Sequence, residues 1–448
     1  MLQTLANALK TKEIRNRLIY TLVALVIVRF GCQLPIPGVD STFVKNFFDQ
    51  QGGIGSGVSF FDSMTGGSFS SMSIFALNIT PYITSSIIIQ LLTIAIPRLE
   101  ELQKEGEDGR KKIAEYTRYI TVALSLLESL GMVFAFGNQG YLKDGLTFTN
   151  IFVCVGALTA GASFIMWIGE RITEKGVGNG ISIVLLINIL SRFPNDMANL
   201  YNKFIANATV MNKLLAGAAI IVILIAMVAF IVVLQDAERR IPVQYAKKMQ
   251  GRKTFGGQSS HIPLKVNTAG VIPVIFASSI MSFPIVIASF FGVRPQSGAG
   301  ASLGQKILKI LNQSDWCNFK DIYQFKYTIG LVIYIVLVIF FAYFYTSITF
   351  NPVEVSNNMK KAGGFIPGIR PGTPTTEYLT KVLNNIIFIG AIGLTIVAIT
   401  PIFFAGAFDA DVSFSGTSLI IIVGVVLETI KKIESMMLVR HYKGFLSE

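Results

Sequence analysis

Residues that could carry covalent or metal chemistry are scarce in this sequence. The only two histidines, His261 and His441, both lie in predicted cytoplasmic segments, so we do not expect a histidine metal site. Neither a Walker-type phosphate loop nor an HExxH motif occurs. The glycines of Gly176-Val-Gly-Asn-Gly180 follow an apolar helical run rather than a strand, so they predict a tight turn and not a nucleotide site. We therefore expect a protein that is not an enzyme and uses no metal or cofactor.

Two basic segments, 236–268 and 350–382, offer another kind of chemistry. Their basic residues include Arg252, Lys253, Lys360, Lys361 and Arg370. Pro and Gly hold such segments in defined turns, and arginine can bind phosphates or carboxylates bidentately. A merely solvated loop would not need Phe365, Ile366 and Ile369 beside the second cluster. We favour a surface on which a partner docks, with a solvated loop as the alternative.

A third unusual stretch is residues 57–72, GVSFFDSMTGGSFSSM, which is semi-apolar and rich in Gly and Ser. It is too short and too polar to span a membrane. Such a segment can fold back into a protein only where protein or a water-filled cavity surrounds it. Its small side chains would let it pack loosely and leave at little cost, so we expect a re-entrant segment. An ordinary outer loop is the alternative.

Polar side chains also stand inside apolar runs. Gln90 lies within IIIQLL at 87–92, and Asn188 lies in a later run. In lipid such groups hydrogen-bond across helix interfaces and contribute roughly 0.6 to 2 kcal/mol each. Adhesion between helices is one explanation, and the seam of a gate is the other.

The composition indicates what positions these residues. Of the 448 residues, 52% are hydrophobic and only 14% are charged, with a mean hydropathy of +0.59, whereas a soluble protein has roughly 25% charged residues. A disordered chain is excluded because such chains are poor in apolar residues. A disulfide scaffold is excluded because the three cysteines show no paired spacing. Most of the chain must lie in lipid. The net charge of +12 then belongs to loops, where it also suits anionic lipids.

Apolar runs predict ten membrane-spanning helices, since a span needs about twenty apolar residues. The runs lie at about 18–34, 74–96, 119–136, 151–169, 181–191, 214–235, 269–292, 328–349, 383–405 and 418–438. The fifth is short, and we expect it to continue as a helix toward residue 205 despite Pro194. With a cytoplasmic N-terminus, most of the 38 Lys and Arg residues fall on the cytoplasmic side, so both termini are predicted there.

These spans divide the chain into two halves of five. The predicted parts are a cytoplasmic amphipathic helix at 1–17, a first half at 18–205, a second half at 206–438 and a cytoplasmic tail at 439–448. Because five is odd, the halves must begin on opposite sides of the membrane. Inverted halves are common in proteins that pass material across membranes.

Specific motifs run through nearly the whole chain. They are SIFALNITPYITSSIIIQLL at 73–92, EG at 105–106, GRKK at 109–112, YTRY at 116–119, IPVQYAK at 241–247, IPLKVN at 262–267, AGVIP at 269–273 and FIPGIRPG at 365–372. With these motifs the sequence resembles the SecY family, the channel subunits of the bacterial protein translocase. The resemblance implies an all-α membrane protein of ten helices, whose inverted halves form a clamshell around a central pore. It also implies a lateral gate between spans two and three and spans seven and eight.

The same resemblance implies functional residues. The apolar pore ring falls on Ile79, Ile83, Leu185, Ile275 and Ile421. A plug falls near 58–73, with Phe60, Phe61, Met64, Gly66, Gly67 and Phe69. The lateral gate includes Gln90, and the residues for partner docking are Arg252, Lys253, Lys360, Lys361 and Arg370.

Partners and location also follow from the resemblance. The partners would be the small subunits SecE and SecG, the ATPase SecA, translating ribosomes and preproteins that carry signal sequences. The protein would pass unfolded polypeptides across the bacterial plasma membrane and release signal or transmembrane segments into it sideways. Energy must come from a partner, because no nucleotide motif is present. The alternative, a secondary transporter of small solutes, would predict paired charges at mid-membrane, which the sequence does not show.

Overall fold

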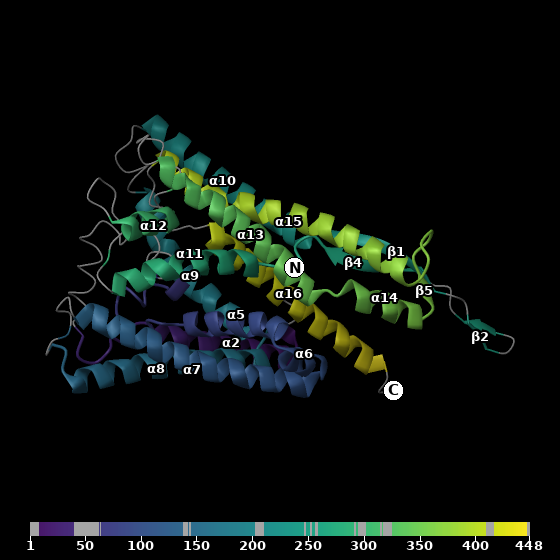
Figure 1. Cartoon of the computed structure of the whole chain (residues 1–448), viewed down its shortest axis with the longest axis horizontal. Coiled ribbons are helices and arrows are strands. Elements are labelled where there is room, and N and C mark those ends of the chain that lie inside the picture. The colour runs from purple at the N-terminus through teal and green to yellow at the C-terminus, as the bar shows by residue number, and fades with distance from the viewer. Residues whose placement is uncertain are drawn as a thin grey trace.

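The computed structural model of the chain is a bundle of long helices with a small β-sheet at one end (Figure 1). It describes residues 9–39, 62, 64–137, 142, 145–201, 210–245, 248–250, 253–255, 259–290, 293, 302–313, 316, 325–408 and 416–445. Within these ranges, a helix covers most of each apolar run that predicts a span.

Five of these helices belong to the predicted first half and five to the second. The first five are α2 (Lys12–Gly31), α5 (Thr80–Ala95), α7 (Glu107–Gly137), α8 (Phe148–Lys175) and α9 (Gly180–Leu200). The second five are α10 (Val210–Asp236), α11 (Ile272–Phe290), α13 (Ile329–Thr349), α15 (Thr373–Phe408) and α16 (Gly416–Phe445). Shorter helical segments are α6 (Pro97–Lys104), α12 (Leu303–Leu311), α14 (Pro352–Lys361) and the 3-10 helix η3 (Phe325–Thr328).

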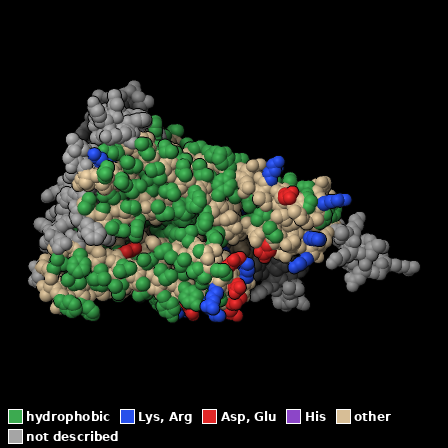
Figure 2. All heavy atoms as spheres, viewed as in Figure 1, with side chains coloured by type: hydrophobic (Ala, Val, Ile, Leu, Met, Phe, Trp, Pro, Cys, Tyr) green, Lys and Arg blue, Asp and Glu red, His purple; other side chains and the backbone are tan. Residues whose placement is uncertain are grey.

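Length and hydropathy identify membrane spans among the described residues. Four stretches are long and apolar enough to cross a bilayer: Glu107–Phe134, Phe148–Lys175, Ile329–Lys361 and Thr373–Phe403. A fifth is added if α5 and α6, which meet at a bend of 102°, count as one broken span. In Figure 2, hydrophobic side chains cover the viewed face of the helices, whereas Lys, Arg, Asp and Glu gather at the end that holds the sheet. The protein is therefore a multi-pass membrane protein.

The helices lie in two groups (Figure 1). Helices α2, α5, α7 and α8 lie along one side, and α10, α13 and α15 lie along the other. Between them, α9 contacts α2, α8 and α16; α11 contacts α7 and α13; and α16 contacts α9, α10 and α15. Residues of the two halves therefore meet in the middle of the molecule, on α9, α11 and α16.

Several boundaries differ from the predicted ones. Helix α2 runs without a break across residue 17, the predicted end of the N-terminal helix. Helix α5 begins at Thr80 rather than 74, because the chain turns between Met72 (φ 45°) and Asn78 (φ 49°). Helix α9 does continue through Pro194, and α16 continues into the predicted tail as far as Phe445. The predicted boundary between the halves, at 205/206, lies outside the described residues.

The turn predicted at 176–180 is confirmed. Gly178 has φ +77°, which favours glycine. The side chain of Asn179 then caps α9, because its Oδ1 accepts hydrogen bonds from the backbone N–H groups of Ile181 (3.2 Å) and Ser182 (3.5 Å).

The two basic segments fold together, which the sequence analysis did not predict. Strand β1 (Glu238–Tyr245) pairs antiparallel with β4 (Ser259–Lys265) and with β5 (Gly364–Phe365), so the sheet order is β4-β1-β5. A separate hairpin, β2 (Lys248–Gln250) with β3 (Lys253–Phe255), lies farthest from the helices in Figure 1. The side chains of Ile241, Val243, Leu264, Met359, Ile366, Leu379, Val382 and Ile386 form the core beneath the sheet. We call this unit, residues 236–268 and 350–382 where they are described, the sheet module.

Candidate functional site

The five residues predicted as a pore ring meet in one apolar cluster. Ile79 and Ile83 lie at the start of α5, Leu185 on α9, Ile275 on α11 and Ile421 on α16. Ile79, Leu185 and Ile421 are buried members of the cluster, and Ile83 and Ile275 are partly buried against it. Four helices from both halves thus bring these side chains together, although they are spread over more than 300 residues of sequence. We call this the ring cluster.

Part of the predicted plug packs directly on the ring cluster. The side chain of Met64 is buried among the same apolar residues. Phe69 makes an edge-to-face contact with Phe136 on α7, with ring centroids 6.3 Å apart. The expectation of a segment folded into the protein thus fits the described part of this stretch, residues 62 and 64–73. Phe60 and Phe61 lie outside the described residues.

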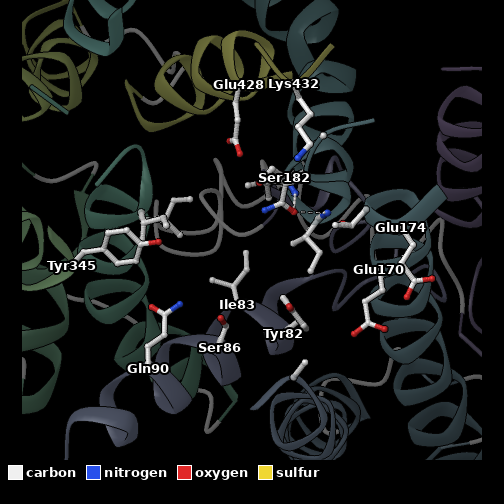
Figure 3. A pocket seen from close by; sticks show the side chains of 18 of the residues that line it. Tyr82, Ile83, Ser86, Gln90, Glu170, Glu174, Ser182, Tyr345, Glu428 and Lys432 are labelled. Carbon is white, nitrogen blue, oxygen red and sulfur yellow. Dashed lines mark hydrogen bonds between the residues drawn. The ribbon is translucent and has the colours of Figure 1, made fainter. Parts of the chain in front are cut away.

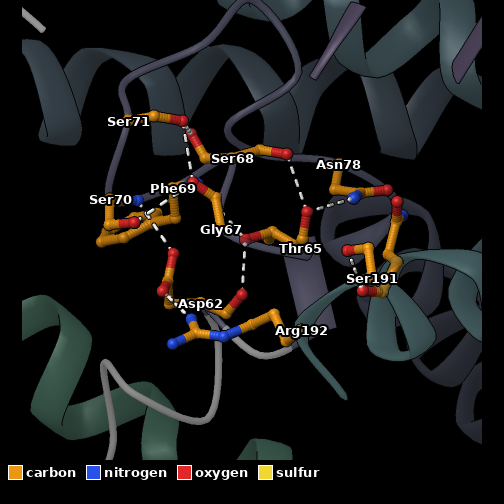
Figure 4. Close-up of polar contacts among 11 residues, drawn as sticks. Asp62, Thr65, Gly67, Ser68, Phe69, Ser70, Ser71, Asn78, Ser191 and Arg192 are labelled. Atoms are coloured by element: carbon orange, nitrogen blue, oxygen red, sulfur yellow. Dashed lines mark hydrogen bonds and ion pairs between the residues drawn. The ribbon is translucent and has the colours of Figure 1, made fainter. Parts of the chain in front are cut away.

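Turns and short hydrogen bonds give the plug segment its shape (Figure 4). Gly66 (φ +68°) and Gly67 (φ +85°) both adopt the left-handed conformation that favours glycine. The hydroxyl of Ser68 donates to the carbonyl of Thr65 (2.7 Å), and Nδ2 of Asn78 donates to the same carbonyl (3.4 Å). Side chains of this segment therefore form hydrogen bonds with backbone groups that would pair with one another in a regular helix.

Charged residues fix this segment to the neighbouring helices. The carboxylate of Asp62 forms an ion pair with Arg192 on α9 and accepts a hydrogen bond from the backbone N–H of Ser70 (2.9 Å). On α2, Nη1 of Arg29 donates to Oδ1 of Asn188 (3.3 Å). The sequence analysis missed the ion pair, although one signal was available: arginine is rare within membrane segments and its partner is usually functional.

Next to the ring cluster lies a cavity of about 880 Å³ (Figure 3). Its walls come from α5, α7, α8, α9, α11, α13 and α16 and from the turn before α9. Ile83, Leu185 and Ile275 of the ring cluster belong to its lining. The ring cluster therefore borders this cavity through three of its residues and also packs with Met64 of the plug segment, which is not among the lining residues.

Away from the ring cluster the cavity wall also carries charged side chains. Nε of Arg118 on α7 donates to Oε1 of Glu170 on α8 (2.7 Å). In Figure 3, Glu428 and Lys432 of α16 point into the cavity from the wall opposite Tyr82. Acidic and basic groups are thus mixed around a wide space, unlike the compact paired-charge site that a small-solute transporter would need.

Gln90, the predicted gate residue, lines the same cavity. It lies on α5 opposite Tyr345 of α13 in Figure 3. Among the described residues its buried Oε1 has no hydrogen-bond partner, which is costly for a buried polar atom. Asn188 differs in part: its Oδ1 accepts the hydrogen bond from Arg29 and joins α9 to α2, whereas its buried Nδ2 also has no partner among the described residues. Adhesion between helices therefore accounts for the carbonyl of Asn188 but leaves the carbonyl of Gln90 unexplained.

The predicted docking residues lie on the sheet module. Lys360 and Lys361 are exposed in the last turn of α14. The side chain of Arg370 is also exposed, while its backbone carbonyl accepts a hydrogen bond from the hydroxyl of Thr375 (2.7 Å). Lys253 belongs to strand β3, and Arg252 lies outside the described residues.

One reason for expecting a docking surface needs correction. Ile366 is only 3% exposed in the core of the sheet module, and Ile369 packs against that core. These two side chains serve packing and therefore say nothing about a partner. Phe365 is 36% exposed and could still contact one. In the part of the chain that the structure describes, no group of three or more His, Cys, Asp or Glu residues could hold a metal ion.

Comparison with known proteins identifies the family. A family model described as SecY matches residues 73–430. The chain is 43% identical over 465 residues to "Protein translocase subunit SecY" of Streptomyces coelicolor, with all of both chains covered. It is 40% identical over 453 residues to the protein of the same name from Halalkalibacterium halodurans, again over the full length of both.

Solved structures share the fold at low sequence identity. One, described as "The plug domain of the SecY protein stablizes the closed state of the translocation channel and maintains a membrane seal", has a TM-score of 0.61 and 16% identity, covering 95% of this chain and 93% of that one. Another, "Sec61 in the Canine ribosome-channel complex from the endoplasmic reticulum", has a TM-score of 0.54 and 14% identity with the same coverage. These likenesses bear out the helical architecture.

Proposed function

Because this chain belongs to the SecY family and is a protein-conducting channel, we propose that polypeptides pass through its ring cluster. The observation that carries this proposal is that the ring cluster borders the cavity and also packs with Met64 of the plug segment. The cavity receives the polypeptide, the ring cluster surrounds it, and the plug segment moves aside. A transporter of small solutes finds no support among the relatives.

The ring cluster suits this task for a physical reason. Isoleucine and leucine side chains offer no hydrogen bonds, so a hydrated ion that enters the ring must lose water without compensation. A sliding polypeptide of varied sequence needs only a flexible apolar collar, which Ile79, Ile83, Leu185, Ile275 and Ile421 can form. The closed ring thus holds back ions, and the occupied ring closes around the chain.

The plug segment adds a second barrier. Met64 is buried in the ring cluster and does not belong to the lining of the cavity. Its neighbours are held by hydrogen bonds between serine and threonine hydroxyls and the backbone and by one ion pair. The hydrogen bonds can be exchanged for water at moderate cost, since the net contribution of a typical hydrogen bond is about 1 kcal/mol, whereas the ion pair is the stronger contact.

Release into the membrane would occur where α5 and α7 face α11 and α13. Helix α7 contacts α11, and Gln90 and Tyr345 both line the cavity on this side. A signal sequence supplies an apolar helix that gains about 25 cal/mol per Å² on moving from the pore into lipid. Its binding would shift the population toward an open gate. The buried carbonyl of Gln90 is available as an acceptor for such a segment.

The translocase would need partners to supply energy. The sheet module faces the cytoplasm in this proposal, and both chain termini lie on that side of a bacterial plasma membrane. Its exposed Lys360, Lys361 and Arg370 receive the ATPase SecA or a translating ribosome. The small subunits SecE and SecG complete the assembly, and anionic lipids contact the remaining basic residues. We propose that Arg252 and Lys253 take part in binding the same partners.

Translocation of a precursor into proteoliposomes tests the function. The chain is reconstituted with its small partner subunits, and SecA, ATP and a precursor with a signal sequence are added. We expect ATP-dependent protection of the precursor from external protease, and none when the chain is omitted. Uptake of small solutes without any protected precursor, in the presence of a competent motor, would contradict the proposal.

A further inference from the structure

Two arginines on membrane helices lie beside the plug segment. Arg29 is near the end of α2, and Arg192 is on α9. A guanidinium is costly within a membrane protein unless it is paired, and such residues usually mark a function. Each of the two has a partner: Arg192 forms an ion pair with Asp62, and Arg29 donates a hydrogen bond to Asn188. The pairing of Asp62 is the only ion pair between the plug segment and a helix among the described residues.

The ion pair of Arg192 is shielded from solvent. The side chain of Asp62 is 11% exposed and that of Arg192 is 26% exposed. Because Asp62 also accepts the backbone N–H of Ser70, one carboxylate joins the two ends of the plug turn to α9 (Figure 4). Breaking this contact would leave a partly buried charge without its partner, which is strongly unfavourable.

The second arginine lies against the backbone of the plug segment. A Cβ atom placed on Gly66 would lie 2.7 Å from Nη1 of Arg29, 2.8 Å from the carbonyl oxygen of Asn188 and 2.9 Å from Oγ of Ser191. Only glycine fits so close to these groups, and its φ of +68° favours glycine as well. The plug segment is therefore seated directly on α9 and on the side chain of Arg29.

Helix α9 carries both the plug contacts and a ring residue. Leu185, Asn188 and Arg192 follow one another at positions i, i+3 and i+7, which lie on one face of a helix. Leu185 belongs to the ring cluster, Asn188 touches the plug segment at Gly66, and Arg192 holds Asp62. One face of α9 therefore contacts the ring cluster at one level and the plug segment at the next.

We propose that Arg192 is a positioning residue of the plug, and that α9 couples the ring to the plug through it. While Leu185 packs in the ring cluster, Arg192 is placed to hold Asp62 and the plug stays seated. A polypeptide that displaces Leu185 moves the same helix face and separates Arg192 from Asp62. The inference rests on the proposed sealing role of the plug, and it adds the group that holds the plug and the helix that releases it.

Resting ion conductance tests the proposal. The full chain with its partner subunits is placed in planar bilayers without precursor, as wild type, Arg192→Glu, Asp62→Arg and the doubly exchanged variant. We expect each single reversal to raise the conductance about tenfold, because it replaces attraction by repulsion at a shielded site. The double exchange should restore it to within about twofold of wild type, and Arg192→Lys should stay close to wild type. A variant in the exposed Lys104–Glu100 pair of α6, Lys104→Glu, serves as the matched control.

We call the ion pair of Asp62 with Arg192 the latch. The experiment distinguishes a latch that does not hold the plug from a plug that does not seal the pore. Deletion of 60–71 should raise the resting conductance if the plug seals the pore. A leaky deletion with Arg192→Glu as tight as wild type would overturn the latch and keep the plug. A deletion as tight as wild type would overturn both. The latch would also be overturned if the doubly exchanged variant leaks as much as each single reversal. The leak would then come from a general loosening of the packing and not from loss of the ion pair. Monodisperse elution of every variant shows that it has folded.

Discussion

The ring cluster and the sheet module place their active residues in opposite ways. In the ring cluster the residues proposed to act are themselves the core: Leu185 is 6% exposed and Ile421 is 1% exposed. In the sheet module the core consists of other residues, such as Ile366, and the residue proposed to act, Arg370, is exposed. In the ring cluster the same residues therefore provide both the packing and the proposed function, whereas in the sheet module different residues provide each.

This difference indicates how each region can respond to substitution. A change in the ring cluster alters packing and the barrier to ions together. A change of an exposed charge in the sheet module can remove a partner contact and leave the fold intact. The predictions below test whether the two regions can be disturbed independently, and they are ordered by the size of the expected effect.

The largest effect is expected from Arg370→Glu. Reversing an exposed charge at a partner contact places like charges together, which costs several kcal/mol. We expect SecA-driven translocation into proteoliposomes to fall by about tenfold or more, whereas resting ion conductance should stay within about twofold of wild type. Lys104→Glu on α6 is the matched control, because Lys104 is also exposed but lies outside the sheet module.

Either of two results would contradict this contrast between the sheet module and the ring cluster. Full translocation by Arg370→Glu would remove this residue from the docking surface. A raised resting conductance would mean that the sheet module and the ring cluster are coupled, so that exposed charge and buried seal are not independent.

A smaller effect is expected from Leu185→Asn, and it should appear in the resting ion conductance rather than in translocation. The amide would bring hydrogen-bonding capacity into an apolar ring and lower the cost of dehydrating an ion. We expect resting conductance in planar bilayers to rise about three- to tenfold, while SecA-driven translocation remains within about twofold. Leu190→Asn provides the control, because Leu190 is on the same helix but is 44% exposed. Equal leakage from both variants would deny the ring any special role.

Much of this organisation could be predicted from the sequence. The apolar runs indicate the helices, because burial in lipid imposes a hydropathy signal on each span without reference to its neighbours. The turn at 176–180 could also be predicted, since glycine and a capping Asn act locally. The resemblance to SecY further pointed to the five residues that meet in the ring cluster. That their role is to seal the pore remains a prediction.

Other features depend on contacts between distant residues and could not be predicted from the sequence. Strand β5 consists of Gly364 and Phe365 and exists only because it pairs with β1, more than 100 residues earlier. The pair of Arg118 with Glu170 and that of Arg192 with Asp62 likewise join separate helices or segments. Ile366 was misinterpreted for the same reason: an apolar side chain in a basic loop suggests a partner until the sheet above it is known.

The smallest functional effect is expected from Ile366→Ala, which separates packing from docking within the sheet module. Truncating a side chain that is 3% exposed should destabilise the module by about 2 to 4 kcal/mol. Hydrogen exchange of strands β1 and β4 should therefore become faster. Translocation at low temperature should fall by no more than about threefold, because Arg370 keeps its charge and most modules stay folded. Phe365→Ala, at the exposed residue that precedes Ile366 and ends strand β5, should leave hydrogen exchange nearly unchanged. If Ile366→Ala instead abolishes translocation while exchange stays slow, Ile366 contacts the partner itself, and the sheet module then combines packing and function as the ring cluster does.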